Sequence, residues 1–115
     1  MLKKYTGSCH CGAVRFTIMS DISQSAVCDC SLCRRRGSVM VRCHYEHLSI
    51  LQGQDALTVY SFNTMIAKHY FCKVCGVYTF HKMRKLPDLY AVNAGCLEDV
   101  NLFALQPEFI QGSLK

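Results

Sequence analysis

The sequence predicts a mainly β protein that forms one domain of antiparallel strands. Its 115 residues match the usual size of a single domain. The apolar residues gather in short runs rich in Val, Tyr, Phe, Ile and Thr, and Gly, Asp, Asn and Ser lie between these runs. No window of about 11 residues keeps a clear helical period. We therefore expect one domain over residues 1–115, with strands as its main elements.

Six apolar runs are expected to form strands. In chain order they are Ala13–Ile18, Val39–Cys43, Leu48–Leu51, Leu57–Phe62, Val77–Phe80 and Leu89–Val92. Strands separated by turn residues in this way are typical of antiparallel sheets. Short helical turns are expected only at Ser31–Arg36 and His44–His47. Six aromatic residues recur near alternate strand positions, which favours packing in the core. They are Tyr60, Phe62, Tyr70, Phe71, Tyr78 and Phe80.

The composition excludes disordered and membrane-spanning classes of protein. Apolar residues make up 50% of the chain and charged residues 18%, and the apolar runs are too short to cross a bilayer. The N-terminal MLKK is followed by Tyr5, Thr6, Gly7 and Ser8 where a signal peptide would have its apolar region. We expect a cytoplasmic protein whose thiols stay reduced. Nine cysteines, an odd number, also cannot all pair, so metal binding is the favoured use of the cysteine clusters.

The charge of the chain argues against a nucleic-acid partner. The formal net charge is +5. Zinc held by four thiolates carries −2 and zinc held by three carries −1, so two such sites lower the charge to about +2. The basic residues gather in two runs, Arg34–Arg36 and Lys82–Lys85, which favours a basic rim near one site or a solvated loop rather than a basic face.

Two pairs of cysteines predict a closed structural metal site. Cys9 and Cys11 precede Gly12, and Cys72 and Cys75 precede Gly76. Two cysteines separated by one or two residues can reach one ion from a tight turn, so each pair supplies half of a tetrahedral zinc site. Four thiolates leave no position for a substrate, so this site would add to the stability of the fold. The alternative is a set of four reduced thiols without metal.

A third cluster, Cys28, Cys30 and Cys33, predicts a reactive site. Three thiolates fall within six residues without a fourth partner nearby. Zinc held by three protein ligands keeps one position open for water, a carbonyl oxygen or a thiol. The run Arg34, Arg35 and Arg36 follows at once and is expected to bind the carboxylates of an anionic thiol such as glutathione. The alternative is dithiol redox chemistry, which C-x-x-C motifs also perform.

The remaining cysteines and histidines give weaker signals. Cys43 and Cys96 stand alone, so each is expected to be a small buried hydrophobe rather than a further ligand of the open site. Of the five histidines, only His44 and His47 have the spacing of a ligand pair, and none of the five is expected to bind zinc. The five are His10, His44, His47, His69 and His81. Three of them, His44, His69 and His81, are candidates for a general base if the fold brings them near the open site.

Four segments together resemble the glutathione-dependent formaldehyde-activating enzyme family. They are G-S-C-H-C-G-A-V-R-F at Gly7–Phe16, C-D-C-S-L-C-R at Cys28–Arg34, H-Y-F-C-K-V-C-G-V at His69–Val77 and V-N-A-G-C-L at Val92–Leu97. The segment Tyr60–Val77 is most similar to the branch of the family that contains centromere protein V. The resemblance covers roughly Lys4 to Gly112, and all seven cysteines that it requires are present.

The resemblance implies a β-tent fold of antiparallel sheets with two zinc ions. It places a structural zinc at the four-cysteine site and a second zinc at Cys28, Cys30 and Cys33. The activity that it implies is that of a carbon–sulfur lyase which adds glutathione to formaldehyde, giving S-(hydroxymethyl)glutathione, or reverses this addition.

Two functional hypotheses follow. In the first, the protein is an enzyme that acts on a thiol adduct of a small aldehyde, with the three-cysteine cluster as its catalytic centre. In the second, it is a non-catalytic zinc module that binds a protein or nucleic acid partner, which the basic runs and the similarity to centromere protein V favour.

Overall fold

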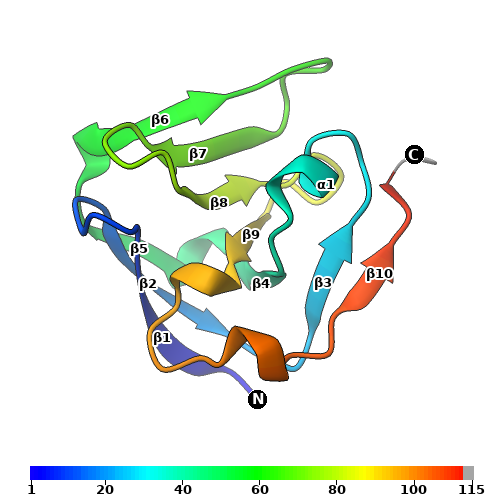
Figure 1. The fold of residues 1–115 in the computed structure, drawn as a ribbon, viewed down its shortest axis with the longest axis horizontal. Coiled ribbons are helices and arrows are strands. Elements are labelled where there is room, and N and C mark those ends of the chain that lie inside the picture. Colours follow the sequence, from blue (N-terminus) through cyan, green and yellow to red (C-terminus); the bar gives the residue numbers. More distant parts are fainter. Residues whose placement is uncertain (113–115) are drawn as a thin grey trace.

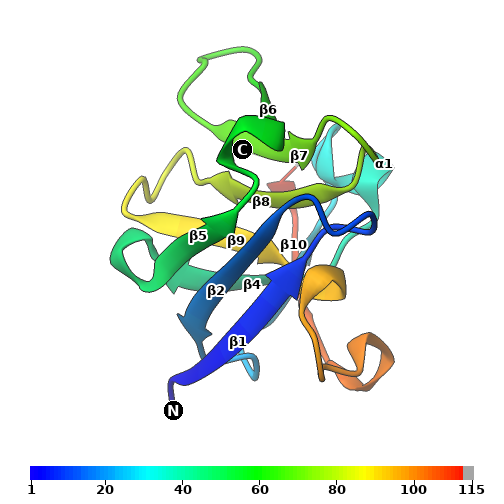
Figure 2. The same ribbon diagram turned by 90° about the vertical axis from the view of Figure 1, so that its left-hand side faces the viewer.

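The computed structural model describes residues 1–112 and contains two β-sheets that share one hydrophobic core. The smaller sheet has the order β1-β2-β5, and the larger has the order β10-β3-β4-β9-β8-β7-β6. In Figure 2 the strands β1, β2 and β5 lie in front of the larger sheet. The prediction of a mainly β fold is confirmed. The last residues of the expected domain, 113–115, lie outside the described part of the chain.

The strands are short, and most of the connections between them are short. Their bounds are β1 Lys3–Ser8, β2 Arg15–Ser20, β3 Ser25–Cys28, β4 Met40–His44, β5 Leu48–Gln52, β6 Leu57–Tyr60, β7 Lys68–Cys72, β8 Tyr78–Lys82, β9 Leu89–Asn93 and β10 Glu108–Ile110. The one α-helix among residues 1–112 is α1, Cys33–Arg36. Four 3-10 turns complete the described elements: η1 Tyr45–His47, η2 Gln54–Ala56, η3 Ala94–Cys96 and η4 Leu102–Ala104.

All six expected strands are present, with ends within two residues of the predicted ones. Both expected helical turns are also present, as α1 and η1. The apolar runs did not predict β1, β3, β7 or β10. One edge of the larger sheet departs from the expected antiparallel pairing, since β10 pairs with β3 in parallel. Figure 1 shows β10, in red, beside β3 at the right of the molecule.

The core lies between the two sheets. In β2 the side chains alternate, so Phe16 and Ile18 are fully buried while their neighbours are partly exposed. Phe16 meets Phe80 of β8 edge to face, with ring centroids 5.3 Å apart, and this contact joins the smaller sheet to the larger one. Phe80 is buried as expected. The prediction of core packing is wrong for Tyr60 and Phe62, which are 49% and 39% exposed.

Within residues 1–112, none of the helices has the length and apolar composition required to span a membrane.

Candidate metal centres and the pocket beside them

The four cysteines of the expected structural site lie together at two hairpin turns. Cys9 and Cys11 lie in the turn from β1 to β2, whereas Cys72 is the last residue of β7 and Cys75 lies in the turn that follows it. One turn therefore comes from each sheet. Gly12 and Gly76 have φ of 83° and 77°, which is the left-handed region that a glycine adopts without strain. Each turn can thus fold back tightly just after its cysteines.

The geometry of these four sulfur atoms fits a tetrahedral zinc ion. The Sγ atoms lie within 4.8 Å of one another, with 3.6 Å from Cys9 to Cys11 and 3.7 Å from Cys11 to Cys72. Sulfurs about 2.3 Å from a common ion would be separated by about 3.8 Å. Backbone N–H groups of Val14 and Val74 also donate hydrogen bonds to Cys9 and Cys72, which stabilise thiolates. This group can hold a metal ion.

The second group, Cys28, Cys30 and Cys33, lies where β3 ends and α1 begins. Their Sγ atoms also fall within 4.8 Å of one another, and all three side chains are partly exposed. Backbone N–H groups of Cys30 and Cys33 donate to the sulfurs of Cys28 and Cys30 at 3.5 and 3.4 Å. Among residues 1–112 no fourth Cys, His, Asp or Glu joins this group. It offers three thiolates to an ion and leaves one side accessible.

The C-terminal segment closes one side of the three-cysteine group. The N–H of Asp29 donates to the carbonyl of Ile110, and this bond extends the β3–β10 pairing to the start of the cysteine loop. Gly112 then packs directly against Cys28 and Cys30. A Cβ at this position would overlap Cys28 Sγ and lie 3.0 Å from Cys30 Cβ. The segment after β10 therefore leaves room for nothing larger than glycine there.

The three cysteines open into a cavity of about 910 Å³. Four cationic side chains line this cavity, and its one acidic lining residue is Asp29. The cations are Arg34, Arg42, Arg84 and Lys85. A cavity with this balance of charge attracts anions. The basic run at Lys82–Lys85 predicted a basic rim, but nothing in the sequence pointed to Arg42, whose position on the cavity-facing side of β4 depends on the fold.

The three successive arginines, 34–36, lie in different environments in the structure. Arg34 lines the cavity. Arg35 is exposed and donates from Nη1 to the carbonyl of Ser31 at 2.6 Å. Arg36 turns inward, where its guanidinium stacks on the ring of Tyr78 at 3.7 Å and donates to Cys33 Sγ at 3.5 Å. The three residues therefore have different surroundings, since successive positions of a helical turn point in different directions.

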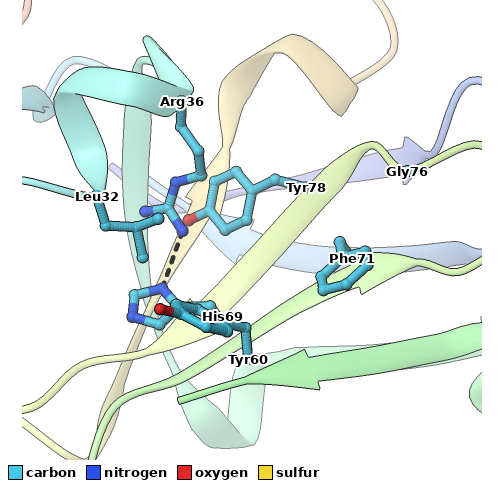
Figure 3. A pocket seen from close by; sticks show the side chains of 7 residues that line it. All are labelled: Leu32, Arg36, Tyr60, His69, Phe71, Gly76 and Tyr78. Atoms are coloured by element: carbon cyan, nitrogen blue, oxygen red, sulfur yellow. Dashed lines mark hydrogen bonds between the residues drawn. The ribbon is translucent and has the colours of Figure 1, made fainter. Parts of the chain in front are cut away.

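Arg36 and Tyr78 also line a smaller cavity of about 270 Å³, which Figure 3 shows. His69 lies between the two cavities, because it lines both. Arg36 Nη1 donates to His69 Nδ1 at 2.9 Å, the bond drawn as a dashed line in Figure 3. The positive guanidinium lies next to Cys33 and would offset the negative charge of its thiolate form.

Of the three histidines considered as bases, two reach the larger cavity. His69 of β7 and His81 of β8 both line it. Burial, with Arg36 as a second cause, lowers the pKa of His69 to about 4. Burial, with His69 and Arg36 as further causes, lowers the pKa of His81 to about 3. His44 lies elsewhere, where its Nδ1 accepts from the N–H of Glu46.

The two remaining cysteines do not join either group. Cys43 and Cys96 are buried, with 5% and 7% of their surface exposed, as expected from the sequence. Burial raises the pKa of Cys43 to about 11 and that of Cys96 to about 12, so both remain thiols.

Comparison with known proteins agrees with the resemblance seen in the sequence. The model of the family described as glutathione-dependent formaldehyde-activating enzyme matches residues 4–111. A crystal structure of a Rhodobacter sphaeroides protein superimposes with a TM-score of 0.88 and is 40% identical. The alignment covers 95% of this chain and 100% of that one.

Proposed function

Because the chain belongs to the glutathione-dependent formaldehyde-activating enzyme family, we propose that it is a zinc-dependent carbon–sulfur lyase. Its substrate would be the adduct of glutathione, or of another thiol, with a small aldehyde such as formaldehyde. The observation that carries this proposal is the accessible group of three cysteines that lines a cavity together with four cationic side chains. The free state of all nine cysteines fits a cytoplasmic location, where glutathione is abundant and thiols are reduced.

The two cysteine groups would have different tasks. The four-cysteine group joins one hairpin turn from each sheet, so zinc there would be structural. Zinc at Cys28, Cys30 and Cys33 would supply a Lewis acid for the aldehyde oxygen or a ligand position for the thiol sulfur. The three cysteines line the larger cavity, and Gly112, which lines it too, packs against Cys28 and Cys30.

The cations of the cavity would orient the substrate. Glutathione carries two carboxylates, and arginine pairs with a carboxylate through two parallel N–H donors. We assign this role to Arg34, Arg42, Arg84 and Lys85, which line the cavity beside the cysteines. The expected contribution of Arg35 and Arg36 is therefore smaller. A cavity of about 910 Å³ lies within the range of small-molecule sites.

The first experiment measures metal content and glutathione binding together. We expect about two zinc ions per chain, one of which mild chelation removes along with glutathione binding. The variant Cys30→Ser should retain one zinc and its fold but lose glutathione binding, whereas the matched control Cys43→Ala should retain both ions. One tightly held zinc with no glutathione binding would overturn the proposal and favour the non-catalytic module.

The second experiment tests the chemistry itself. The zinc-loaded protein should speed the exchange between glutathione, formaldehyde and their adduct above the spontaneous rate, as followed by NMR exchange spectroscopy. The variant Arg34→Ala should weaken glutathione binding by about 10-fold, since it removes a charge-assisted contact. The neighbouring Arg35→Ala serves as its control and should bind as the wild type does. An exchange rate equal to the spontaneous one for every thiol tried would contradict the proposed activity.

A further inference from the structure

Two histidines lie side by side at the wall of the larger cavity. His69 of β7 pairs in register with His81 of β8, and their ring centroids are 4.6 Å apart. Both residues are 8% exposed, and both line the cavity that the three cysteines also line. Their lowered pKa values keep both rings neutral near pH 7. A neutral imidazole carries one proton, so the partner of Nδ1 decides what Nε2 can do.

The contact with Arg36 leaves Nε2 of His69 as a hydrogen-bond donor. Its Nδ1 lies 2.9 Å from Nη1 of Arg36. A guanidinium only donates hydrogen bonds, so His69 Nδ1 must accept. The single proton of the neutral ring then lies on Nε2. Figure 3 shows this second nitrogen on the side of the ring away from the bond to Arg36.

The contact with Tyr78 leaves Nε2 of His81 with a free lone pair. The hydroxyl of Tyr78 lies 2.6 Å from His81 Nδ1 and 3.3 Å from the carbonyl oxygen of Ala91. A tyrosine has one proton to donate, and a carbonyl can only accept. Both contacts are hydrogen bonds only if Tyr78 donates to Ala91 and accepts from His81. His81 then carries its proton on Nδ1, and its Nε2 can accept one.

We propose that His81 Nε2 is the general base of this site and that His69 Nε2–H stabilises the oxygen of the substrate. This inference rests on the proposed function and assigns two catalytic residues within it. In cleavage, His81 takes the hydroxyl proton of the adduct, the oxygen forms a double bond to carbon, and the carbon–sulfur electron pair leaves with sulfur as thiolate. In synthesis, the thiolate attacks the carbonyl carbon while protonated His81 returns the proton to oxygen.

The surroundings suit these two roles. His69 donates to the oxygen where negative charge develops, as donors of an oxyanion hole do. An anionic substrate in the cavity would raise the pKa of His81, because negative charge favours the imidazolium. Arg36 and Tyr78 are positioning residues in this scheme, since each sets the tautomer of one histidine.

The first test needs no activity. Long-range ¹⁵N–¹H NMR spectra of the wild-type protein distinguish the two imidazole tautomers. We expect His69 in the Nε2–H form and His81 in the Nδ1–H form at pH 7. The variant Tyr78→Phe keeps the ring under Arg36 but removes the hydroxyl, so His81 should no longer hold one tautomer. Two histidines of the same tautomer in the wild type would overturn the inference.

The second test measures exchange of the adduct in three histidine variants. His81→Gln should lower kcat/KM by about 100-fold or more, which is typical for loss of a general base. Its zinc content and its Kd for glutathione should stay within about 2-fold. His69→Phe should also lower kcat/KM by about 100-fold, as expected when an oxyanion-hole donor is lost. His69→Gln should lower kcat/KM by less, because its amide can still donate a hydrogen bond. His44 lies outside the cavity, so the control variant His44→Gln should have the kcat/KM of the wild type.

The outcomes separate the two proposals. An active wild type whose rate survives His81→Gln overturns this inference and leaves the proposed lyase standing. A wild type that accelerates no exchange overturns both. Should His81→Gln fail to fold, Tyr78→Phe replaces it: a loss of about 10-fold in rate with unchanged glutathione binding supports the assignment, and an unchanged rate and tautomer contradict it.

Discussion

Replacement of Gly112 by alanine should weaken zinc binding at the proposed site formed by Cys28, Cys30 and Cys33 while sparing the fold. The backbone of Gly112 is not in the left-handed region, so an alanine adds no conformational strain. The added methyl group would instead overlap Cys28 Sγ and lie 3.0 Å from Cys30 Cβ. Contacts of this kind are normally at least about 3.5 Å, so the chain must move by about 1 Å.

A zinc ion held by Cys28, Cys30 and Cys33 would tolerate much less movement than this. Zinc–sulfur distances vary by about 0.2 Å around 2.3 Å. A shift of the cysteine loop should therefore lower zinc affinity by about 10- to 100-fold, the range seen when groups around metal ligands are altered. That range corresponds to about 1.4–2.7 kcal/mol. The four-cysteine group is formed by other turns, so its zinc and most of the thermal stability should remain.

The assay is a competition titration with a chromophoric zinc chelator, with thermal unfolding recorded on the same samples. Gly112→Ala should have one zinc of wild-type affinity and one that is lost at lower chelator concentration. The control is Gly95→Ala, because a Cβ at this exposed residue would meet only the Asn93 side chain within 3.4 Å. Two zinc ions of wild-type affinity in Gly112→Ala would show that the C-terminal segment does not support the cluster.

Three further predictions concern stability. Cys72→Ser should unfold the domain or lower its thermal midpoint sharply, because it opens the site that joins the two sheets; a soluble variant with an unchanged midpoint in thermal unfolding would refute this. Phe80→Ala should cost about 3–5 kcal/mol in denaturant unfolding, since Phe80 is 2% exposed, whereas Phe103→Ala, at a residue 93% exposed, should cost almost nothing. Acid should destabilise the fold through His69 and His81. Their pKa values in the folded protein, about 4 and about 3, lie below the ordinary 6.5. The unfolded chain therefore binds more protons than the folded one between these values. As a result, the stability that is present above pH 6.5 falls as the pH decreases toward 4. His81→Gln should flatten this decline in the thermal midpoint, measured with zinc content checked at each pH; parallel declines would contradict this explanation.

Several features could be predicted because they depend on neighbours in the sequence. The pairs Cys9/Cys11 and Cys72/Cys75 sit beside glycines in tight turns, and a turn of that kind is a local property. The strong apolar runs also became strands, since their side chains can be buried in almost any sheet. Both groupings of cysteines expected from spacing lie together in the structure.

Four strands were missed for a physical reason. β1, β3, β7 and β10 contain Lys, Ser, His or Glu, and their place in the sheets depends on a partner strand rather than on a continuous apolar run. The parallel pairing of β10 with β3 joins segments about eighty residues apart. No local pattern can indicate such a contact, because pairing between distant strands is decided by the packing of the whole domain.

The sequence by itself therefore indicated the metal-binding chemistry that we propose for this protein: seven thiols at ligand spacing, and the turns that present them. The tertiary structure decided which groups surround that chemistry. It turned Arg34 toward the cavity and Arg36 toward the interior, and it placed His69 beside His81 although twelve positions separate them. Metal-ligand turns are local, whereas a cavity is made by residues from many strands, so its charge and its hydrogen bonds exist only after the sheets have packed.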